Sequence, residues 1–416
     1  MQLVAYGAQD IYLTGNPQIT FFKVVYRRHT NFSVESIEQT FNGTADFGKR
    51  VTATISRNGD LVSNVYLQIK VPALTQSDGT ASTAVWWTNG FGNAVVKNAE
   101  VEIGGQRIDK HYAEWMDIWG ELNVPGCQKE SYDKMVGNYN STNGLQLSGN
   151  AIRNLYVPLR FWFCRNPGLA LPLIALQYHE VKLNIEFNTA LTMVQNNGTA
   201  TISSLTTGSS FTSCSLWVDY VYLDTDERRR FAQISHEYLI EQVQHTGTET
   251  IAASATSKKV TLNYNHPVKS LHWVMVDTAY TTSGATHTAN KPLTYSSNNA
   301  ASSTNTDGDT FTDMKLQLNG HDRFAVRPAD YFRLVQNYQH HTCSPRKHVY
   351  TYSFALKPDE HQPSGTCNFS RIDNATMNFS FNSTDHTATA LGLKVFAVNY
   401  NVLRIMSGMG GLAYSN

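Results

Sequence analysis

The side chains best suited to metal chemistry are concentrated in one short stretch. His340, His341, Cys343 and His348 carry the imidazole and thiolate groups that bind zinc and related metals. They lie in a polar, proline-containing loop, and their spacing does not supply the four ligands of a standard metal-binding motif. The 14 histidines are never two, three or four residues apart. The imidazole pairs of cupins and zinc peptidases are therefore missing, and the pattern favours an ordinary loop over a metal site.

Other catalytic motifs are also missing. The sequence contains no G-x-S-x-G and no G-x-x-x-x-G-K-[ST], so a hydrolase nucleophile elbow and a phosphate-binding loop have no support. Residues 407–411 (SGMGG) are glycine-rich, but only five residues follow them, which favours a tight turn. The aromatic run Phe161, Trp162 and Phe163 has no interleaved basic residues and is typical of core packing. We therefore predict no enzymatic activity and no cofactor.

The composition is that of a neutral, β-rich chain. The 33 basic residues balance the 33 acidic ones among 416 residues, so we expect no direct contact with nucleic acid. Charged residues make up only 16%, and the abundance of Asn, Ser and Thr favours strands joined by polar loops. The most apolar stretch, residues 168–178, is too short to span a bilayer. We therefore expect a soluble chain. Five cysteines without a C-x-x-C motif favour a reducing compartment.

An internal repeat indicates the domain organisation. Residues 101–105 (VEIGG) and 316–320 (LQLNG) each alternate apolar residues and end in glycine, as strands that enter a tight turn do. A helical pattern follows each of them. The apolar positions of the two helices are Trp115, Ile118, Trp119 and Leu122 in the first, and Tyr331, Leu334, Val335 and Tyr338 in the second. Both sets are spaced i, i+3, i+4, i+7, which predicts an amphipathic helix after each strand.

Further segments repeat at a similar separation. The pairs are residues 27–44 with 229–248, residues 62–71 with 268–276, and the alternating strands at 181–187 and 375–381. Each half offers about eight strands, the number that a jelly roll needs to close two facing sheets. We therefore predict an all-β chain of two consecutive eight-stranded jelly-roll β-sandwiches with short helices in the connections. The predicted domains are residues 1–223 and 237–416, and the charged linker 224–236 forms a loop or a short solvated helix.

Several motifs carry a likeness to a known family. They are residues 6–10 (YGAQD), 13–22 (LTGNPQITFF), 103–109 (IGGQRID), 168–173 (GLALPL), 178–181 (YHEV) and 401–408 (NVLRIMSG). Together they closely resemble the major capsid protein of large icosahedral double-stranded DNA viruses of algae, the phycodnavirus or chlorovirus type. The resemblance runs through nearly the whole chain. It weakens only in polar stretches that we interpret as loops, such as residues 188–213 and 278–313.

The resemblance implies a function and a set of partners. It implies a double jelly roll that forms a homotrimer, shaped as a pseudo-hexagonal capsomer, in an icosahedral shell above an internal viral membrane. The implied partners are neighbouring capsomers, minor capsid proteins and the host surface, which outer loops would contact. The implied location is the virion, after assembly in the host cytoplasm. An alternative is a minor capsid or spike jelly roll that binds host-surface carbohydrate.

Relatives of this type carry Asn-linked sugars on exposed loops, which makes two asparagines candidates. Asn290 and Asn305 partly match the sequence context of those sites, although Lys291 and Thr304 depart from it. Both lie in residues 278–313, which have few charges and no sustained apolar alternation. Such a segment buries too little apolar area to offset its ordering entropy. We therefore expect it to project from the sandwich on the outer, host-facing side.

Overall fold

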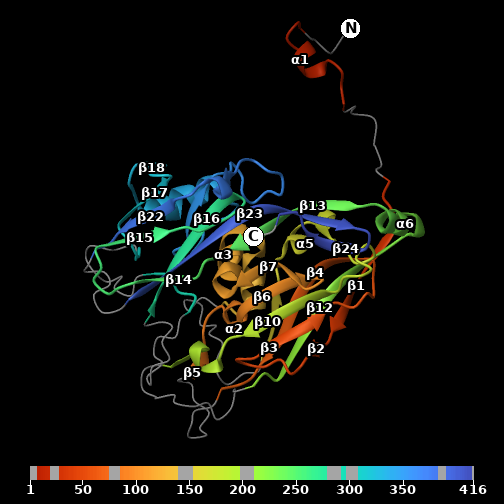
Figure 1. Cartoon of the computed structure of the whole chain (residues 1–416), viewed down its shortest axis with the longest axis horizontal. Helices are drawn as coiled ribbons and strands as arrows, with labels where there is room; N and C mark the ends of the chain where they lie inside the picture. Colours follow the sequence, from red (N-terminus) through yellow and green to blue (C-terminus); the bar gives the residue numbers. More distant parts are fainter. Residues whose placement is uncertain are drawn as a thin grey trace, which may run out of the picture.

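The computed structural model describes residues 7–18, 28–74, 85–138, 153–196, 210–278, 292–296, 308–382 and 390–414. In this part of the chain, antiparallel strands form two β-sandwiches that lie side by side, with short helices in their connections (Figure 1). This confirms the prediction of an all-β fold with two consecutive jelly rolls. The short helix α1 (Ile11–Thr14) is exposed and lies apart from both sandwiches.

The first sandwich has two facing sheets. One has the strand order β1-β12-β4-β8, and the other has the order β2-β3-β10-β6-β7. The first sheet contains β1 (Phe32–Gln39), β4 (Leu61–Val71), β8 (Arg153–Pro158), β9 (Leu171–Pro172) and β12 (Ser213–Leu223). The second contains β2 (Phe41–Asn42), β3 (Arg50–Thr54), β6 (Val96–Ile103), β7 (Gln106–Tyr112) and β10 (Val181–Phe187). A small separate ladder joins β5 (Val85–Trp87) to β11 (Val194–Asn196).

The second sandwich repeats this topology. Its sheets have the orders β13-β23-β16-β20 and β15-β22-β17-β18. The first sheet contains β13 (His236–Gln244), β14 (Thr248–Ile251), β16 (Pro267–Asp277), β20 (Tyr350–Ser353), β21 (Cys367–Asn368), β23 (Leu391–Met406) and β24 (Met409–Leu412). The second contains β15 (Ser257–Thr261), β17 (Asp313–Leu318), β18 (His321–Asp322), β19 (Arg327–Pro328) and β22 (Ala375–Ser380). Because β1, β4 and β10 occupy the places of β13, β16 and β22, the predicted repeat is confirmed.

The two copies agree down to their irregularities. The pairing of β4 with β12 shifts by one residue at Ser63, and the pairing of β16 with β23 shifts at Lys269. With these two bulges superimposed, Tyr66 of β4 corresponds to His272 of β16. Trp217 of β12 likewise corresponds to Phe396 of β23. Both copies also turn between two strands through two left-handed residues, Gly104-Gly105 in the first and Asn319-Gly320 in the second.

Short helices fill the connections. They are α2 (Phe91–Val95), α3 (Ala113–Asn123), α4 (Gly126–Val136), α5 (Trp162–Arg165), η2 (Pro167–Leu169), η3 (Ala190–Met193), α6 (Thr225–Gln233), η5 (Tyr331–Val335), α7 (Gln336–His340) and η6 (Phe369–Arg371). The charged run between the sandwiches is the helix α6, which has no buried residue, as one of the two predicted alternatives required. No helix among the described residues is long and apolar enough to cross a membrane.

The two predicted amphipathic helices form, but they differ in burial. The stripe of α3 is packed inside the protein, with Trp115, Ile118 and Leu122 all buried. In the segment η5 plus α7, the corresponding Leu334, Val335 and Tyr338 are exposed. The apolar positions of the second helix therefore do not pack into the core of its own half. Phe332 and its neighbours fill that role instead, because the helix turns its other side toward the sandwich.

Two main cores hold the fold together, and one of them spans both halves. The larger cluster contains the first sandwich's interior together with residues of the second half, including Val274, Phe396 and Val398. The smaller cluster fills the second sandwich around Trp273 and Met377. Burial along β16 is nearly continuous, whereas burial along β4 alternates between buried and partly exposed positions. Both faces of β16 are therefore covered, while one face of β4 is open.

Candidate assembly interface

Helix α3 lies at the junction between the two sandwiches. It follows β7 directly and packs its aromatic side onto the outer face of the second half's β16 and β23. The ring of Trp115 lies 5.4 Å from that of His272 and 5.9 Å from that of Phe396. Lys394 of β23 pairs with Glu114 in the first turn of the helix. The helix is therefore buried on the side that would otherwise face solvent.

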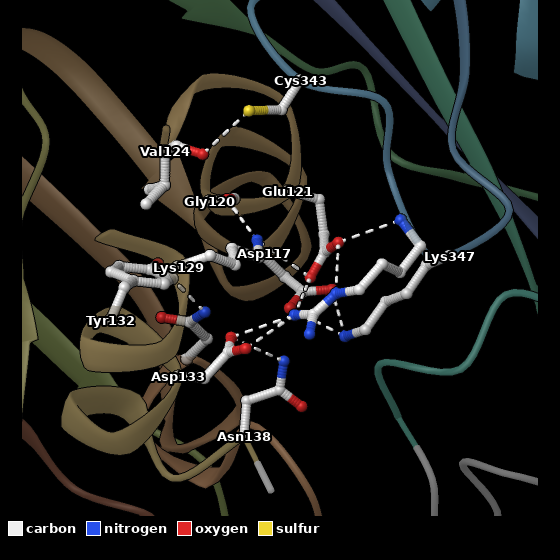
Figure 2. Close-up of polar contacts among 12 residues, drawn as sticks. Asp117, Gly120, Glu121, Val124, Lys129, Tyr132, Asp133, Asn138, Cys343 and Lys347 are labelled. Atoms are coloured by element: carbon white, nitrogen blue, oxygen red, sulfur yellow. Dashed lines mark hydrogen bonds and ion pairs between the residues drawn. The ribbon is translucent and has the colours of Figure 1, made fainter. Parts of the chain in front are cut away.

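A loop from the second half covers α3 with positive charge (Figure 2). Lys347 Nζ lies 2.7 Å from Oδ2 of Asp117, a carboxylate that is itself buried. The hydroxyl of Tyr295 donates to the same carboxylate at 3.0 Å. Burial raises the pKa of Asp117, because the loss of solvation outweighs the attraction of Lys347. This ion pair therefore joins the two halves at a cost in desolvation.

A second carboxylate lies one turn further along α3. Glu121 accepts from the backbone N–H and the guanidinium of Arg346, each at 3.1 Å, and Lys129 Nζ lies 3.1 Å from it. Burial works against its charge, but Lys129, Lys347 and Arg346 together lower the pKa of Glu121 to about 2. The same guanidinium donates to Asp133 of α4 at 3.0 Å. Arg346 thus connects α3, α4 and the second half.

The candidate metal ligands are held in this loop by separate partners. The backbone N–H of Cys343 donates to Leu122 O at 3.0 Å, and its thiol donates to Val124 O at 3.1 Å (Figure 2). His341 Nδ1 lies 2.8 Å from Asp359 Oδ1, and His340 Nδ1 lies 3.0 Å from Leu356 O. Within the described ranges, no three His, Cys, Asp or Glu side chains converge as metal ligands would.

Strand edges and a buried ion cluster extend the junction. The backbone N–H of Val243 in β13 donates to Asp109 Oδ1 of β7 at 3.1 Å. Glu241 of the same strand binds Arg165 at 2.8 Å and Lys269 at 2.6 Å. Burial lowers the pKa of Lys269, although Glu241 opposes the shift. The junction is therefore polar at several points and depends on paired charges.

A cavity of about 380 Å³ lies between these contacts. Trp115, Trp119 and Trp162 line it from the first half, and His272 and His341 line it from the second. Arg160 lies over the ring of Trp119, with 5.1 Å between the guanidinium carbon and the ring centroid. The cavity thus belongs to the same junction as the ion pairs.

The predicted outer loop is anchored at two points in the core. Leu293 and Tyr295 are buried, and Tyr295 reaches Asp117 of α3. Phe311 is also buried, against Tyr350 and Phe379. Three large side chains of residues 278–313 therefore return to packed cores, whereas most of this segment, and with it the predicted outward projection, lies outside the described residues. The glycosylation candidates Asn290 and Asn305 both lie outside the described residues.

Sequence reasoning missed the charged residues that carry this junction. Asp117 and Glu121 lie four residues apart on α3, between its apolar positions. From sequence alone, such carboxylates are predicted to be exposed to solvent. Arg346 and Lys347 follow the candidate metal ligands in the loop. The sequence offered one hint of this junction: the two acidic residues on an otherwise apolar helix could pair with the adjacent bases Arg346 and Lys347, some 225 residues later. No spacing rule connects residues so far apart.

Two family models together cover almost the whole chain. The model described as major capsid protein N-terminus matches residues 20–224. The model described as large eukaryotic DNA virus major capsid protein matches residues 227–411. The division between the two matches falls at α6, between the two sandwiches.

Curated relatives match over their full length. The major capsid protein of Pyramimonas orientalis virus is 52% identical, and that of Paramecium bursaria Chlorella virus 1 is 47% identical. In both cases the match covers 100% of this chain and 99% of the relative.

Solved structures agree with the fold. The PBCV-1 virus capsid quasi-atomic model has a TM-score of 0.78 at 40% identity, covering 95% of this chain and 100% of that one. The Faustovirus major capsid protein shares the fold at only 14% identity, with a TM-score of 0.73, over 96% of this chain and 94% of its own. The chain belongs to the family of major capsid proteins of large eukaryotic DNA viruses.

Proposed function

We propose that three copies of this major capsid protein form a pseudo-hexagonal capsomer that tiles an icosahedral shell. The observation that carries the proposal is the repeated topology, since each chain supplies two sandwiches with the same strand order. Three chains then supply six similar lobes, and a cyclic trimer of such chains has a nearly hexagonal outline. The family relationship favours this role over that of a carbohydrate-binding spike.

Native mass spectrometry of the full chain tests the trimer. Three chains of 46.5 kDa give a particle of about 140 kDa. A species of 46.5 kDa that stays monomeric at micromolar concentration would contradict the proposal.

The domain boundaries belong to the same proposal. We assign residues 1–223 and 237–416 to the two lobes and residues 224–236 to the linker. The division between the two family matches supports this assignment. So does α6, because it has no buried residue and its contact with the first lobe includes an ion pair between Arg228 and Asp60 at 3.0 Å. Strand β13 begins at His236, the last linker residue.

The remaining partners are proposed from the capsid role. Neighbouring capsomers surround each trimer, minor capsid proteins and the internal membrane lie beneath it, and outer loops contact the host. We further propose assembly in the host cytoplasm, a structural role without catalysis, and glycosylation at Asn290 or Asn305. The junction described above supports the structural role, since its carboxylates are committed to ion pairs between the halves. Glycopeptide mass spectrometry of the virion protein tests the two asparagines directly.

A further inference from the structure

The outer face of one sheet is buried in the second half. Strands β16 and β23 present His272, Val274, Phe396 and Val398 on the side away from their own sandwich. These four side chains are 0–3% exposed. Three of them belong to the core cluster that includes α3 of the first half. A helix from the other half therefore covers this face.

The equivalent face of the first half is open. By the shared bulge, Tyr66 and Trp217 hold the places of His272 and Phe396. The two rings stack with centroids 6.5 Å apart, and Tyr156 lies 6.4 Å from Tyr66 on the next strand. All three are partly or fully exposed, and Val34 at the edge of the same face is 57% exposed. We define the aromatic sheet face as Val34, Tyr66, Tyr156 and Trp217, and all four side chains are at least partly exposed in the described part of the chain.

The second half carries the matching helix, and its apolar side is exposed among the residues that the structure describes. The segment η5 plus α7 follows the β17-β18 hairpin as α3 follows the β6-β7 hairpin. Its Leu334, Val335 and Tyr338 correspond to Ile118, Trp119 and Leu122 of α3. They are 50%, 40% and 82% exposed. We name these three residues the apolar helix face.

We propose that the apolar helix face of one copy packs on the aromatic sheet face of the next copy. The contact repeats between chains what α3 does within the chain. It is head to tail, because the helix comes from the second half and the sheet from the first. Each copy has one face of each kind, so the contact continues around a ring. The inference rests on the proposed trimer and assigns the surfaces that close it.

Two variants, each with one face blocked, test the contact in the full chain. Tyr338→Glu places a charge in the apolar helix face, and Tyr66→Glu places one in the aromatic sheet face. We expect each variant alone to be a 46.5 kDa monomer by native mass spectrometry. The Tyr66→Glu variant keeps an intact apolar helix face, and the Tyr338→Glu variant keeps an intact aromatic sheet face, so a mixture can form one contact. The mixture should therefore form a dimer of two chains, about 93 kDa, and no closed trimer.

The controls separate this inference from the trimer itself. Tyr178 lies outside both faces and its side chain is 75% exposed. The Tyr178→Glu variant should therefore leave the trimer intact. Melting curves monitored by circular dichroism verify that the Tyr66→Glu variant is folded. If it is not, Tyr66→Ser replaces it in the mixture. Trimeric Tyr338→Glu protein would overturn the inference while leaving the trimer standing. A monomeric wild-type chain would overturn both, and monomeric variants that form no dimer on mixing would overturn the head-to-tail contact.

Discussion

Lys347 Nζ lies 2.7 Å from Asp117 Oδ2, which ties a loop of the second half to a buried helix of the first. Replacing the lysine leaves the carboxylate buried and without its cation. We expect Lys347→Met to lower the free energy of unfolding by about 3 kcal/mol, as for other broken buried pairs. Urea denaturation of the full chain measures the change.

Two further variants make this prediction specific. Lys357→Met removes an exposed lysine whose pair with Glu360 is solvated, and should cost less than about 0.5 kcal/mol. Adding Asp117→Asn to Lys347→Met removes the uncompensated charge and should restore part of the loss. If Lys347→Met and Lys357→Met lowered the free energy of unfolding equally, the buried ion pair would contribute no more to stability than the exposed one.

The pKa of Glu121 predicts a loss of stability in acid. Its folded value of about 2 lies below the ordinary value of 4.5, so the folded state binds this proton less readily than the unfolded chain. The stabilisation is present above pH 4.5 and is lost as the pH falls toward 2, by up to about 3 kcal/mol.

Melting temperatures of wild type and Glu121→Gln between pH 2 and pH 7 check this behaviour. The variant should be less stable near neutral pH, and its difference from wild type should shrink as the pH falls below 4.5. The exposed Glu360→Gln is the matched control and should track wild type across this range. A difference between Glu121→Gln and wild type that is constant with pH would contradict the assignment.

Tyr295 anchors the long segment between β16 and β17. Its ring is buried and its hydroxyl donates to Asp117 at 3.0 Å. Tyr295→Phe keeps the ring and removes one hydrogen bond to a charged acceptor, so we expect a loss of about 1.5–3 kcal/mol. Tyr178→Phe, at an exposed tyrosine, should have no measurable effect on chemical denaturation. If Tyr295→Phe left the free energy of unfolding unchanged, packing of the ring alone would hold the segment.

The two halves should not fold well when separated. Truncation after Leu223 exposes Trp115 of α3, whose ring packs on His272 and Phe396 and whose burial stabilises the chain by roughly 2 kcal/mol. The second half would in turn expose Val274 and Phe396. We expect residues 1–223 and 237–416 to be insoluble, or to melt without a sharp transition, when each is expressed alone. Soluble fragments with cooperative melting would show that the junction is dispensable.

The sequence was sufficient for the fold because alternation and repetition are local signals. The parallel of residues 62–71 with 268–276 correctly predicted that β4 and β16 hold the same place in two similar sheets. It could not tell that one outer face is buried and the other open. That difference depends on which helix reaches which sheet, and α3 and η5 plus α7 have the same apolar spacing.

The junction itself was beyond sequence reasoning for a related reason. Arg346 and Glu121 are 225 residues apart, and an ion pair at that separation leaves no periodic trace. The same loop carries the imidazoles and the thiol that a metal site would use, but the structure assigns them to separate hydrogen bonds. Residue types identified the loop as unusual, but only the packing showed that it holds two sandwiches together.

Electron microscopy of the purified full-length protein tests the central claim most directly. Class averages viewed along the particle axis should show six lobes in a nearly hexagonal outline with threefold symmetry, because each of three chains supplies two similar sandwiches. Particles with two lobes, or with a twofold arrangement of four lobes, would contradict the account.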